Sequence, residues 1–437
     1  MASPSELNSY WNIELRLLPL LAHMDATGVN VDSAALQRNK MVIDPLLKDL
    51  EQKAEALVGH PILMWSSKQV CEVLYDELKL EAPKGNRVST ESVLQTMADK
   101  HPFPGLVIEY RRLSKQMSTY IDGLEKEFVS VPFRSTETKL IYSTWNQMAT
   151  GTGRLSTAAP NMQTLPKRSL ERLSNLDVDI RGAFVALPNR RLISVDYRQI
   201  EMRVFAHCSH DIALINLFSS GQNSDIYTMI ASMIHKVEVK DVTQKFRDEA
   251  KVITLGLCYG MGVESMASKL KIPILTATQL KNSILNRFKG VLQFMKNTIS
   301  SARKTHFVET LSGRRRYFKA KDSGGEGLAH IDRQAVNSVI QGSAADLLKC
   351  AMILLWKPLS ELDSEIILQI HDELVIDCPD SDEVCEKVIA LLNQVMCVES
   401  KKMLQDMCKA NHPEIQYDFD VLLEQSVNIG KNMAFKD

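Results

Sequence analysis

The sequence predicts an α+β fold in which long helical stretches are separated from a few strands. Residues 5–60 and 104–127 carry apolar side chains at helical spacing. The run 191–197 is apolar up to Asp196, which is typical of a buried strand, and 364–378 has the pattern of a β-hairpin. At 437 residues, the chain is long enough for two or three domains.

The remaining elements follow in chain order. We expect the first ~130 residues to be all helical, with a turn at 28–32, because helical periodicity continues through them. The pattern further predicts strands at 139–145, 307–311 and 418–429, and mainly helix over 211–305 and 328–356.

Composition and charge narrow the class of protein. The chain is 45% hydrophobic and 24% charged, and no window approaches the unbroken apolar stretch of a membrane helix, so we expect no membrane partner. Its 8 cysteines form no C-x-x-C pair, which favours reduced thiols in an intracellular protein. The net charge is −1, yet residues 245–321 hold 16 Lys and Arg against 4 Asp and Glu. A basic wall of this kind can bind nucleic acid although the whole chain is nearly neutral.

Two acidic stretches stand at the ends of apolar runs: 196–201 and 371–373. Carboxylates at neighbouring strand ends can converge, and Asp196 and Asp372 together suit a pair of Mg²⁺ ions. Glu201 follows Asp196 by five residues and could serve as a metal ligand, a partner for Arg203 or a wall beside a sugar. A polar hairpin turn is the structural alternative for 371–373.

Between these stretches, Arg247, Lys251, Leu255 and Tyr259 recur every four residues and so form one slowly winding helical stripe. A triphosphate lying along the cations would place its base near the tyrosine. A solvated basic face with a core tyrosine would give the same pattern, and this helix alone does not decide between the two.

Two further segments are rich in hydrogen-bond donors. Residues 152–164 contain Arg154 among amides and hydroxyls, and Arg333, Asn337 and Gln341 share one helical face. Such side chains suit the acceptors that every base pair offers in the minor groove. Buried polar contacts between helices would explain the second set equally well.

Together these segments resemble the polymerase domain of the family A DNA polymerases. Asp196-Tyr197-x-Gln199-Ile200-Glu201-x-Arg203 resembles motif A of that family, Arg247-x₃-Lys251-x₇-Tyr259-Gly260 resembles motif B, and His371-Asp372-Glu373 resembles motif C. Residues 152–163, 313–316 and 341–346 match further family segments in the same order. The resemblance runs from about Glu14 to Lys431.

The resemblance implies a right-hand polymerase fold with an antiparallel palm sheet, helical fingers and a helical thumb. It divides the chain into N-terminal helices and thumb (1–137), a first palm part (138–210), fingers (211–305) and a second palm part (306–437). The motif B helix is expected at 245–260.

The resemblance also implies roles for single residues. The metal ligands would be Asp196, Asp372 and the Tyr197 carbonyl, holding two Mg²⁺ ions that Mn²⁺ could replace. The catalytic residues would be Asp196, Asp372 and Lys251. Nucleotide binding would involve Arg247, Lys251, Leu255, Tyr259, Gln199, Glu201 and Tyr227, with Glu201 excluding ribonucleotides. DNA contacts would come from Arg154, Asn161, Gln163, Arg333, Asn337, Gln341 and His371.

Some residues depart from the family pattern. Leu255 stands where the family has an aromatic ring against the incoming nucleotide, and Tyr227 where bacterial relatives have a phosphate-contacting histidine. Segments 206–211, 259–262 and 341–346 are most similar to the eukaryotic theta-type branch. Because thumb-like helices begin near residue 10, we expect no 3′–5′ exonuclease, and therefore no proofreading, in this chain.

The implied function is template-directed DNA synthesis from dNTPs on a primer–template, by a monomer that could belong to a larger repair protein or complex. We expect an intracellular, preferentially nuclear, protein acting in DNA repair by end joining or translesion synthesis. An organellar replicative or gap-filling polymerase and a catalytically weak DNA-binding scaffold stay open as alternatives. A single-subunit RNA polymerase would share the aspartates, but Glu201 leaves little space for a 2′-hydroxyl.

Overall fold

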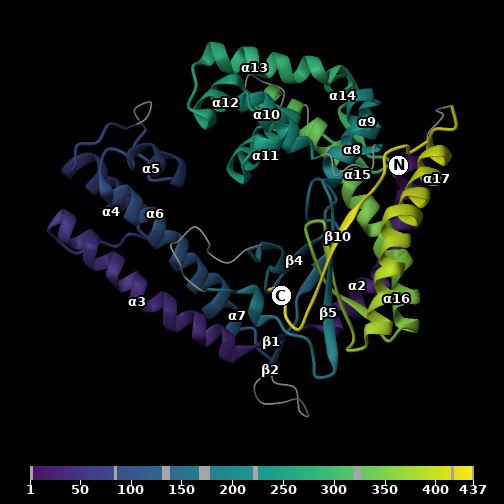
Figure 1. The fold of residues 1–437 in the computed structure, drawn as a ribbon, viewed down its shortest axis with the longest axis horizontal. Coiled ribbons are helices and arrows are strands. Elements are labelled where there is room, and N and C mark those ends of the chain that lie inside the picture. The colour runs from purple at the N-terminus through teal and green to yellow at the C-terminus, as the bar shows by residue number, and fades with distance from the viewer. Residues whose placement is uncertain are drawn as a thin grey trace. The chain divides into compact units, whose positions relative to one another are not determined.

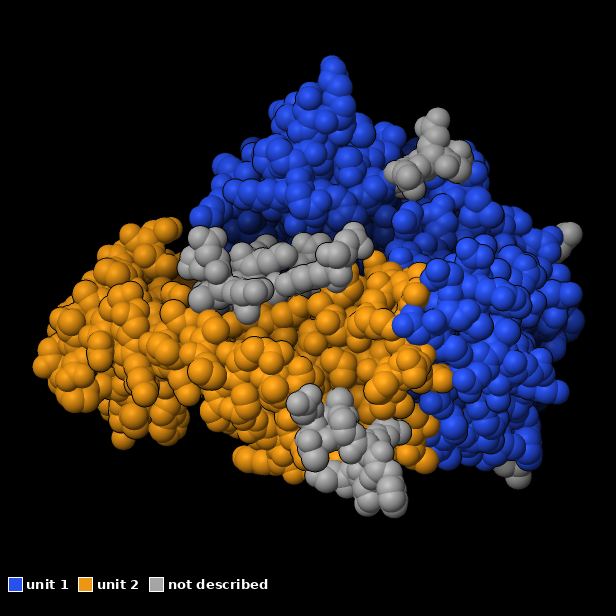
Figure 2. Space-filling view, turned by 60° about the horizontal axis from the view of Figure 1, so that its bottom comes forward, with its two compact units in different colours: residues 1–24, 145–156, 194–427 blue, residues 25–144, 157–193, 428–437 orange. Residues whose placement is uncertain are grey.

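The computed structural model describes residues 3–82, 86–129, 138–166, 178–219, 225–318, 326–414 and 418–435. The chain divides into two compact units that are interleaved in sequence and coloured separately in Figure 2. Unit 1 comprises residues 1–24, 145–156 and 194–427, and unit 2 comprises residues 25–144, 157–193 and 428–437. The four-part division predicted from the sequence stays a prediction.

Unit 2 is mainly helical. Its longer helices are α3 (Ser33–Val58) and α6 (Pro102–Lys115), which pack on each other. Shorter helical segments are α4 (Ser67–Glu72), η2 (Val73–Glu77), α5 (Glu91–Met97), η4 (Gln116–Ile121), α7 (Asp122–Glu125), η5 (Met162–Thr164) and η6 (Arg181–Ala183). Strand β4 covers Ser156–Ala158 at its border with unit 1.

The expectation of an all-helical N-terminal region with a turn at 28–32 is wrong. Val29–Asp32 form strand β1, which pairs antiparallel with β2 (Thr138–Ile141). The strand ends where the Asp32 side chain accepts hydrogen bonds from the backbone N–H groups of Ala34 and Ala35 at the start of α3. The pairing partner lies more than a hundred residues away, so local periodicity gave no sign of it.

Unit 1 contains the N-terminal helices and most of the sheet. Helices α1 (Pro4–Ser9), η1 (Tyr10–Glu14) and α2 (Leu15–Thr27) begin the chain, and β3 covers Thr144–Asn146. The four-stranded sheet has the order β10-β5-β9-β8, formed by Gln425–Gly430, Arg190–Tyr197, Glu373–Pro379 and Glu365–Ile370. Strands β8 and β9 are antiparallel with Ile370 opposite Glu373, so the predicted hairpin with its turn at His371 and Asp372 is confirmed.

A helical cluster follows β5 in the chain (Figure 1). It comprises α8 (Ile200–Ser209), α9 (Ile212–Ser219), α10 (Ile226–His235), η7 (Val239–Asp241), α11 (Gln244–Cys258), α12 (Val263–Leu270), α13 (Ile274–Arg287) and α14 (Lys289–Thr305). Helix α11, which carries the predicted phosphate-binding stripe, packs on α10. The predicted helical region 211–305 is therefore confirmed for its described residues.

Helix α15 (Glu326–Glu361) is the central helix of unit 1 and packs against α8, α14 and α17 (Ser400–Asn411). Among the described helices it alone is long and apolar enough to cross a membrane by length and composition. Because 83% of its most apolar window is buried, this composition is typical of a core helix. Strands β6 (Phe307–Glu309) and β7 (Arg315–Tyr317), helix α16 (Asp382–Gln394) and segment η9 (Val395–Glu399) complete the unit.

Candidate active site

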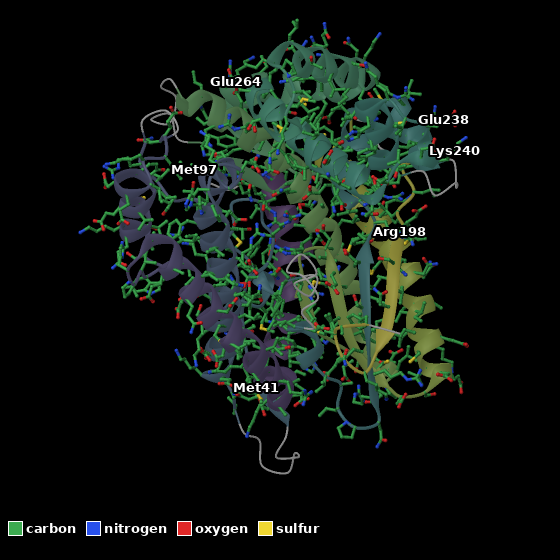
Figure 3. All side chains as sticks on the ribbon, turned by 60° about the vertical axis from the view of Figure 1, so that its left-hand side comes forward. Met41, Met97, Arg198, Glu238, Lys240 and Glu264 are labelled. Atoms are coloured by element: carbon green, nitrogen blue, oxygen red, sulfur yellow. The ribbon has the colours of Figure 1, made fainter. Side chains whose placement is uncertain are left out.

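The structure brings the two predicted metal-binding aspartates to adjacent strand ends. Asp196 is the penultimate residue of β5, and Asp372 lies in the turn between β8 and β9. The backbone N–H of Tyr197 donates a hydrogen bond of 3.4 Å to the Asp372 carbonyl, which fixes the two strand ends side by side. Both aspartates are partly exposed, so they stand at the surface end of an otherwise buried sheet. Arg198, labelled in Figure 3, is the exposed residue that directly follows β5.

Two neighbouring side chains of this pair are engaged elsewhere. Glu373 turns into the sheet, where its carboxylate accepts a 2.6 Å hydrogen bond from the buried Ser194 hydroxyl. The Tyr197 hydroxyl donates to the Met396 carbonyl at 2.9 Å, and burial raises the pKa of this tyrosine, so only its backbone carbonyl is left to face an ion. Among the described residues no group of three or more His, Cys, Asp or Glu could hold a metal. Two carboxylates and a carbonyl fit Mg²⁺, which completes its octahedral shell with water and phosphate oxygens.

Glu201 connects three of the predicted motifs. One of its carboxylate oxygens accepts a hydrogen bond of 2.6 Å from the Arg154 guanidinium, and the other accepts one from the Tyr259 hydroxyl. The same Arg154 nitrogen lies 3.5 Å from Asp372 Oδ1. Burial, and then the charge of Glu201, raises the pKa of Tyr259, so this phenol remains a hydrogen-bond donor. The pairing of Glu201 with Arg203 considered from the sequence does not occur, because Arg203 binds Glu424 at 2.6 Å.

The predicted phosphate-binding stripe lies along α11, which begins where the Thr243 hydroxyl accepts from the Phe246 N–H. Arg247 Nε donates to Asp225 Oδ2 at 2.5 Å, and the guanidinium lies 5.6 Å from the Tyr227 ring centroid. Lys251 is exposed, lies 5.9 Å from the same ring, and forms no ion pair with a described carboxylate. Burial raises the pKa of Tyr227. Two cations therefore flank one buried aromatic ring, with Leu255 one turn further along.

Sequence reasoning missed Asp225 as the residue that organises this stripe. Its carboxylate caps α10 by accepting from the N–H of Tyr227 and Thr228, and it also accepts a 2.8 Å hydrogen bond from Gln199 Nε2. It thereby ties Gln199 and Arg247 to one carboxylate. The only sequence signal is an aspartate immediately before a helical run, which is typical of any helix start.

The predicted DNA-contacting residues fall in both units. Arg333, Asn337 and Gln341 lie on α15, where the buried Asn337 Oδ1 has no hydrogen-bond partner among the described residues and Arg333 packs against Gly260. His371 is exposed in the β8–β9 turn. Asn161 and Gln163 belong to unit 2, where Asn161 caps η5, so their place beside Arg154 stays a prediction.

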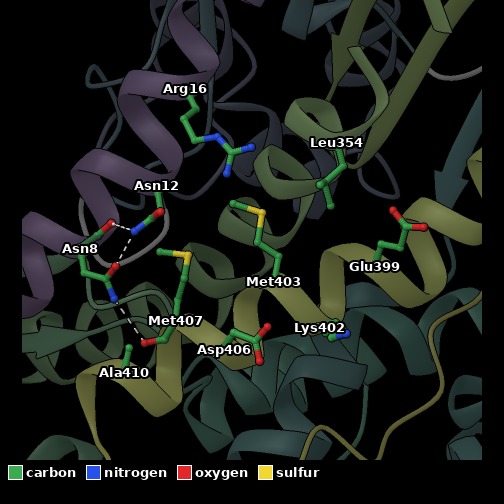
Figure 4. A pocket seen from close by; sticks show the side chains of 10 residues that line it. All are labelled: Asn8, Asn12, Arg16, Leu354, Glu399, Lys402, Met403, Asp406, Met407 and Ala410. Atoms are coloured by element: carbon green, nitrogen blue, oxygen red, sulfur yellow. Dashed lines mark hydrogen bonds between the residues drawn. The ribbon is translucent and has the colours of Figure 1, made fainter. Parts of the chain in front are cut away.

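An open groove of about 520 Å³ lies elsewhere in unit 1 (Figure 4). It is lined by Asn8, Asn12, Arg16, Leu354, Glu399, Lys402, Met403, Asp406, Met407 and Ala410. None of the predicted site residues lines it. The chemistry therefore rests on the carboxylate pair, the Glu201 contacts and the α11 stripe.

Comparison with known proteins agrees with this geometry. The profile of DNA polymerase family A matches residues 33–434. The thermostable DNA polymerase I of Thermus thermophilus is 36% identical over 393 residues, covering 89% of this chain and 46% of that protein. DNA polymerase I of Caldicellulosiruptor bescii is 37% identical over 385 residues, covering 86% and 44% respectively.

A solved structure, the POL domain of Pol1 from M. smegmatis in complex with DNA primer-template and dNTP, matches with a TM-score of 0.83 at 31% identity. The match covers 97% of this chain and 70% of that one. The chain thus spans less than half the length of the curated relatives named above. The α+β fold predicted from the sequence is confirmed, and the chain belongs to DNA polymerase family A.

Proposed function

We propose that this chain is a template-directed DNA polymerase that adds dNTPs to a primer 3′-hydroxyl. The observation that carries the proposal is the placement of Asp196 and Asp372 at adjacent strand ends, with Arg154 joining Asp372 to Glu201. A catalytically weak scaffold would not need two aspartates at one strand edge beside a basic helix stripe. The family relatives named above carry DNA polymerase names, which supports the same activity.

Asp196, Asp372 and the Tyr197 carbonyl would hold two Mg²⁺ ions, for which Mn²⁺ could substitute. When bound, such ions supply activation of the primer hydroxyl and neutralisation of the leaving pyrophosphate. The protein's own contribution is geometric, because the Tyr197–Asp372 backbone hydrogen bond sets the spacing of the ligands. Asp196 lies on a strand and Asp372 directly precedes one, and ligands supported by regular elements are positioned more firmly than ligands on loops.

The triphosphate would lie along α11. Arg247 is oriented through its Nε by Asp225, and its terminal nitrogens, one of which lies 4.0 Å from Asp248 Oδ1, would bind phosphate oxygens. The exposed Lys251 ammonium would donate a proton to the pyrophosphate as it leaves. Glu201, fixed by Arg154 and Tyr259, would occupy the space beside the sugar C2′ and so favour dNTPs over rNTPs. Gln199 and Tyr227 would support this pocket through Asp225 and the two cations.

Primer–template DNA would contact the donors on α15 and nearby loops. Arg154, Arg333, Asn337 and Gln341 would read minor-groove acceptors, Asn161 and Gln163 would extend this surface, and His371 would approach the primer end. The buried Asn337 oxygen supports this assignment, because a side chain packed only for structure would use its acceptor within the protein.

We also propose a branch within the family and a biological role for this chain. Segments 206–211, 259–262 and 341–346 support a place near the theta-type branch, and through it a nuclear role in end joining or translesion synthesis by a monomer within a larger protein. The absence of a proofreading site from this chain is also a proposal, which a misincorporation assay tests.

Primer extension tests the proposed activity. Wild type, Asp372→Asn and Asp406→Asn would be given a labelled primer–template, Mg²⁺ and either dNTPs or rNTPs. We expect dNTP-dependent, templated extension by wild type, loss of at least ~10³-fold in Asp372→Asn, and no change in Asp406→Asn, whose side chain is exposed in the groove of Figure 4. DNA binding without extension by wild type would instead favour the scaffold.

A further inference from the structure

A buried charge cluster lies in unit 1 outside the proposed active site and is formed by Glu14, Arg314, Asp346 and Lys349. Glu14 Oε1 accepts from the Lys349 ammonium at 2.8 Å and from the Arg314 guanidinium at 2.7 Å. Arg314 also donates to Asp346. Asp346 and Lys349 are 0% and 1% exposed, so these charges are almost fully removed from water.

The remaining hydrogen-bonding capacity of the two carboxylates is also used. Asp346 Oδ2 accepts from the Thr310 and Ser312 hydroxyls at 2.7 and 2.6 Å, and Glu14 Oε2 accepts from Gln147 at 2.7 Å. Burial opposes the Arg314 charge, but Asp346 and Glu14 outweigh it and raise the pKa of Arg314. Buried ion pairs contribute little net stability compared with apolar packing, so such a cluster is better understood as fixing a geometry.

The geometry that it fixes is that of residues 150–154, called here the Arg154 loop. Gly153 has a φ of +79° and lies directly on the Arg314 guanidinium, where a Cβ would overlap it. A Cβ on Gly151 would lie 3.0 Å from Arg316 Cζ, and Arg316 is itself held by the Ser338 hydroxyl at 2.8 Å. The loop therefore rests on two planar guanidinium groups that are anchored to α15.

The loop is closed internally as well, because the Thr150 hydroxyl donates to the Arg154 carbonyl at 2.8 Å and the Gly153 N–H donates to the Thr150 carbonyl at 3.2 Å. From its end, Arg154 reaches Glu201 and Asp372. A shift of the Arg314 guanidinium would therefore move the loop and displace Arg154. Arg154 in turn contacts both Glu201 and Asp372.

We propose that Arg314, held between Asp346 and Glu14, is a positioning residue that sets the place of Arg154 during nucleotide addition. This inference rests on the proposed polymerase function. Arg314 itself is a poor candidate for a DNA contact, because two carboxylates already neutralise it. Its neighbour Arg315 points elsewhere, pairing with Glu309 at 2.8 Å and stacking over the Phe307 ring at 4.3 Å.

The neighbouring arginines supply a matched pair of variants, Arg314→Lys and Arg315→Lys. Lysine keeps the charge but lacks the planar guanidinium on which Gly153 rests. We expect Arg314→Lys to lower kcat/KM for correct dNTP addition about tenfold at unchanged Tm, and Arg315→Lys to change it less than twofold. In an Arg154→Ala background, Arg314→Lys should have almost no further effect, since Arg314 acts through Arg154.

A second measurement does not depend on activity. Hydrogen exchange of a peptide covering 148–156 should speed up in Arg314→Lys and in Glu14→Gln, but not in Arg315→Lys. Additive kinetic effects of Arg314→Lys and Arg154→Ala, or unchanged exchange, would overturn the positioning role while leaving the polymerase function intact. Failure of wild type to extend any primer would instead overturn the proposed function, and the exchange result would still decide whether Arg314 fixes the loop.

Discussion

Unit 1 contains two sites with an arginine and a lysine each, and they treat these charges in opposite ways. Along α11, Lys251 is exposed, and Arg247 shares Asp225 with other donors and lies 4.0 Å from the half-exposed Asp248 carboxylate. In the buried charge cluster, by contrast, Lys349 is 1% exposed, and Lys349 and Arg314 together face the carboxylates of Glu14 and Asp346. Both pairs have the same formal charge, and only their surroundings differ.

The surroundings of each pair suit a different task, either binding a ligand or fixing the position of neighbouring groups. A buried charge must be paired and hydrogen-bonded, because leaving it unpaired costs several kcal/mol. A cation that binds a phosphate group has to remain hydrated in the free protein, so that phosphate oxygens can replace its water molecules. The Tyr227 ring attracts Arg247 and Lys251 through cation–π interactions. Because burial raises the pKa of Tyr227, its phenol stays uncharged and does not neutralise these cations. The charges of the proposed phosphate-binding stripe are therefore only partly neutralised, whereas those of the buried cluster are paired with carboxylates.

Removing one lysine from each site separates the two roles. Lys349→Met should lower the free energy of unfolding by about 3 kcal/mol or more, because Glu14 would lose a buried partner. Lys251→Met should change that free energy by less than about 0.5 kcal/mol, yet lower kcat by about 10²-fold or more, because the proposed proton donor to pyrophosphate is lost.

Urea denaturation and primer extension on both variants give the measurement. The two lysines act as controls for each other, since the substitution is the same. Equal losses of stability in both variants would contradict the distinction between the two sites. A stable but inactive Lys349→Met would move that residue into the catalytic machinery.

His207 is a buried titratable group whose neutral form is favoured by burial. It is 3% exposed, stacks on Phe419 at 4.1 Å, and burial, with smaller contributions from His210 and Lys401, lowers its pKa to about 4. The unfolded chain would titrate near the ordinary value of 6.5 and so binds a proton first as pH falls. Stability is therefore lost progressively between pH 6.5 and pH 4, by about 3 kcal/mol in total.

His207→Phe keeps a ring against Phe419 and removes the titration. We expect its unfolding free energy to be flatter than that of wild type between pH 6.5 and pH 4, as measured by urea denaturation at several pH values. His330→Phe, a change on the exposed surface of α15, should leave the wild-type slope unchanged. An identical slope in His207→Phe would place the acid lability in other groups.

Much of this arrangement could be predicted from the sequence, where local patterns carry the information. The apolar run before Asp196, the hairpin around Asp372 and the four-residue steps of α11 each depend on neighbouring residues. Local patterns did not predict strand β1, the contacts of Asp225 with Gln199 and Arg247, or the partners of Glu14. Each of these depends on residues that are far apart in the sequence. A lone glutamate among apolar residues gives no hint that Arg314 and Lys349 lie opposite it.

The smallest expected effect concerns Leu255, the member of the α11 stripe that departs from the family pattern. A family polymerase has an aromatic ring there, and a ring stacked on a base is worth about 1–3 kcal/mol. Leu255→Phe should therefore lower the KM for dNTPs several-fold with little change in kcat, and should alter the discrimination against dideoxynucleotides. The side chain is half-buried, so the larger ring has space to adjust.

Single-nucleotide incorporation with dNTP and ddNTP titrations measures both effects. Leu275→Phe is the control, because it adds the same ring at a highly exposed position of α13 and should leave KM unchanged. An unchanged KM in Leu255→Phe would mean that the incoming base does not lie against residue 255. In that case the triphosphate of the nucleotide would bind α11 through Arg247 and Lys251 while the base points away from residue 255. Only these two cations of the stripe would then contribute to nucleotide binding.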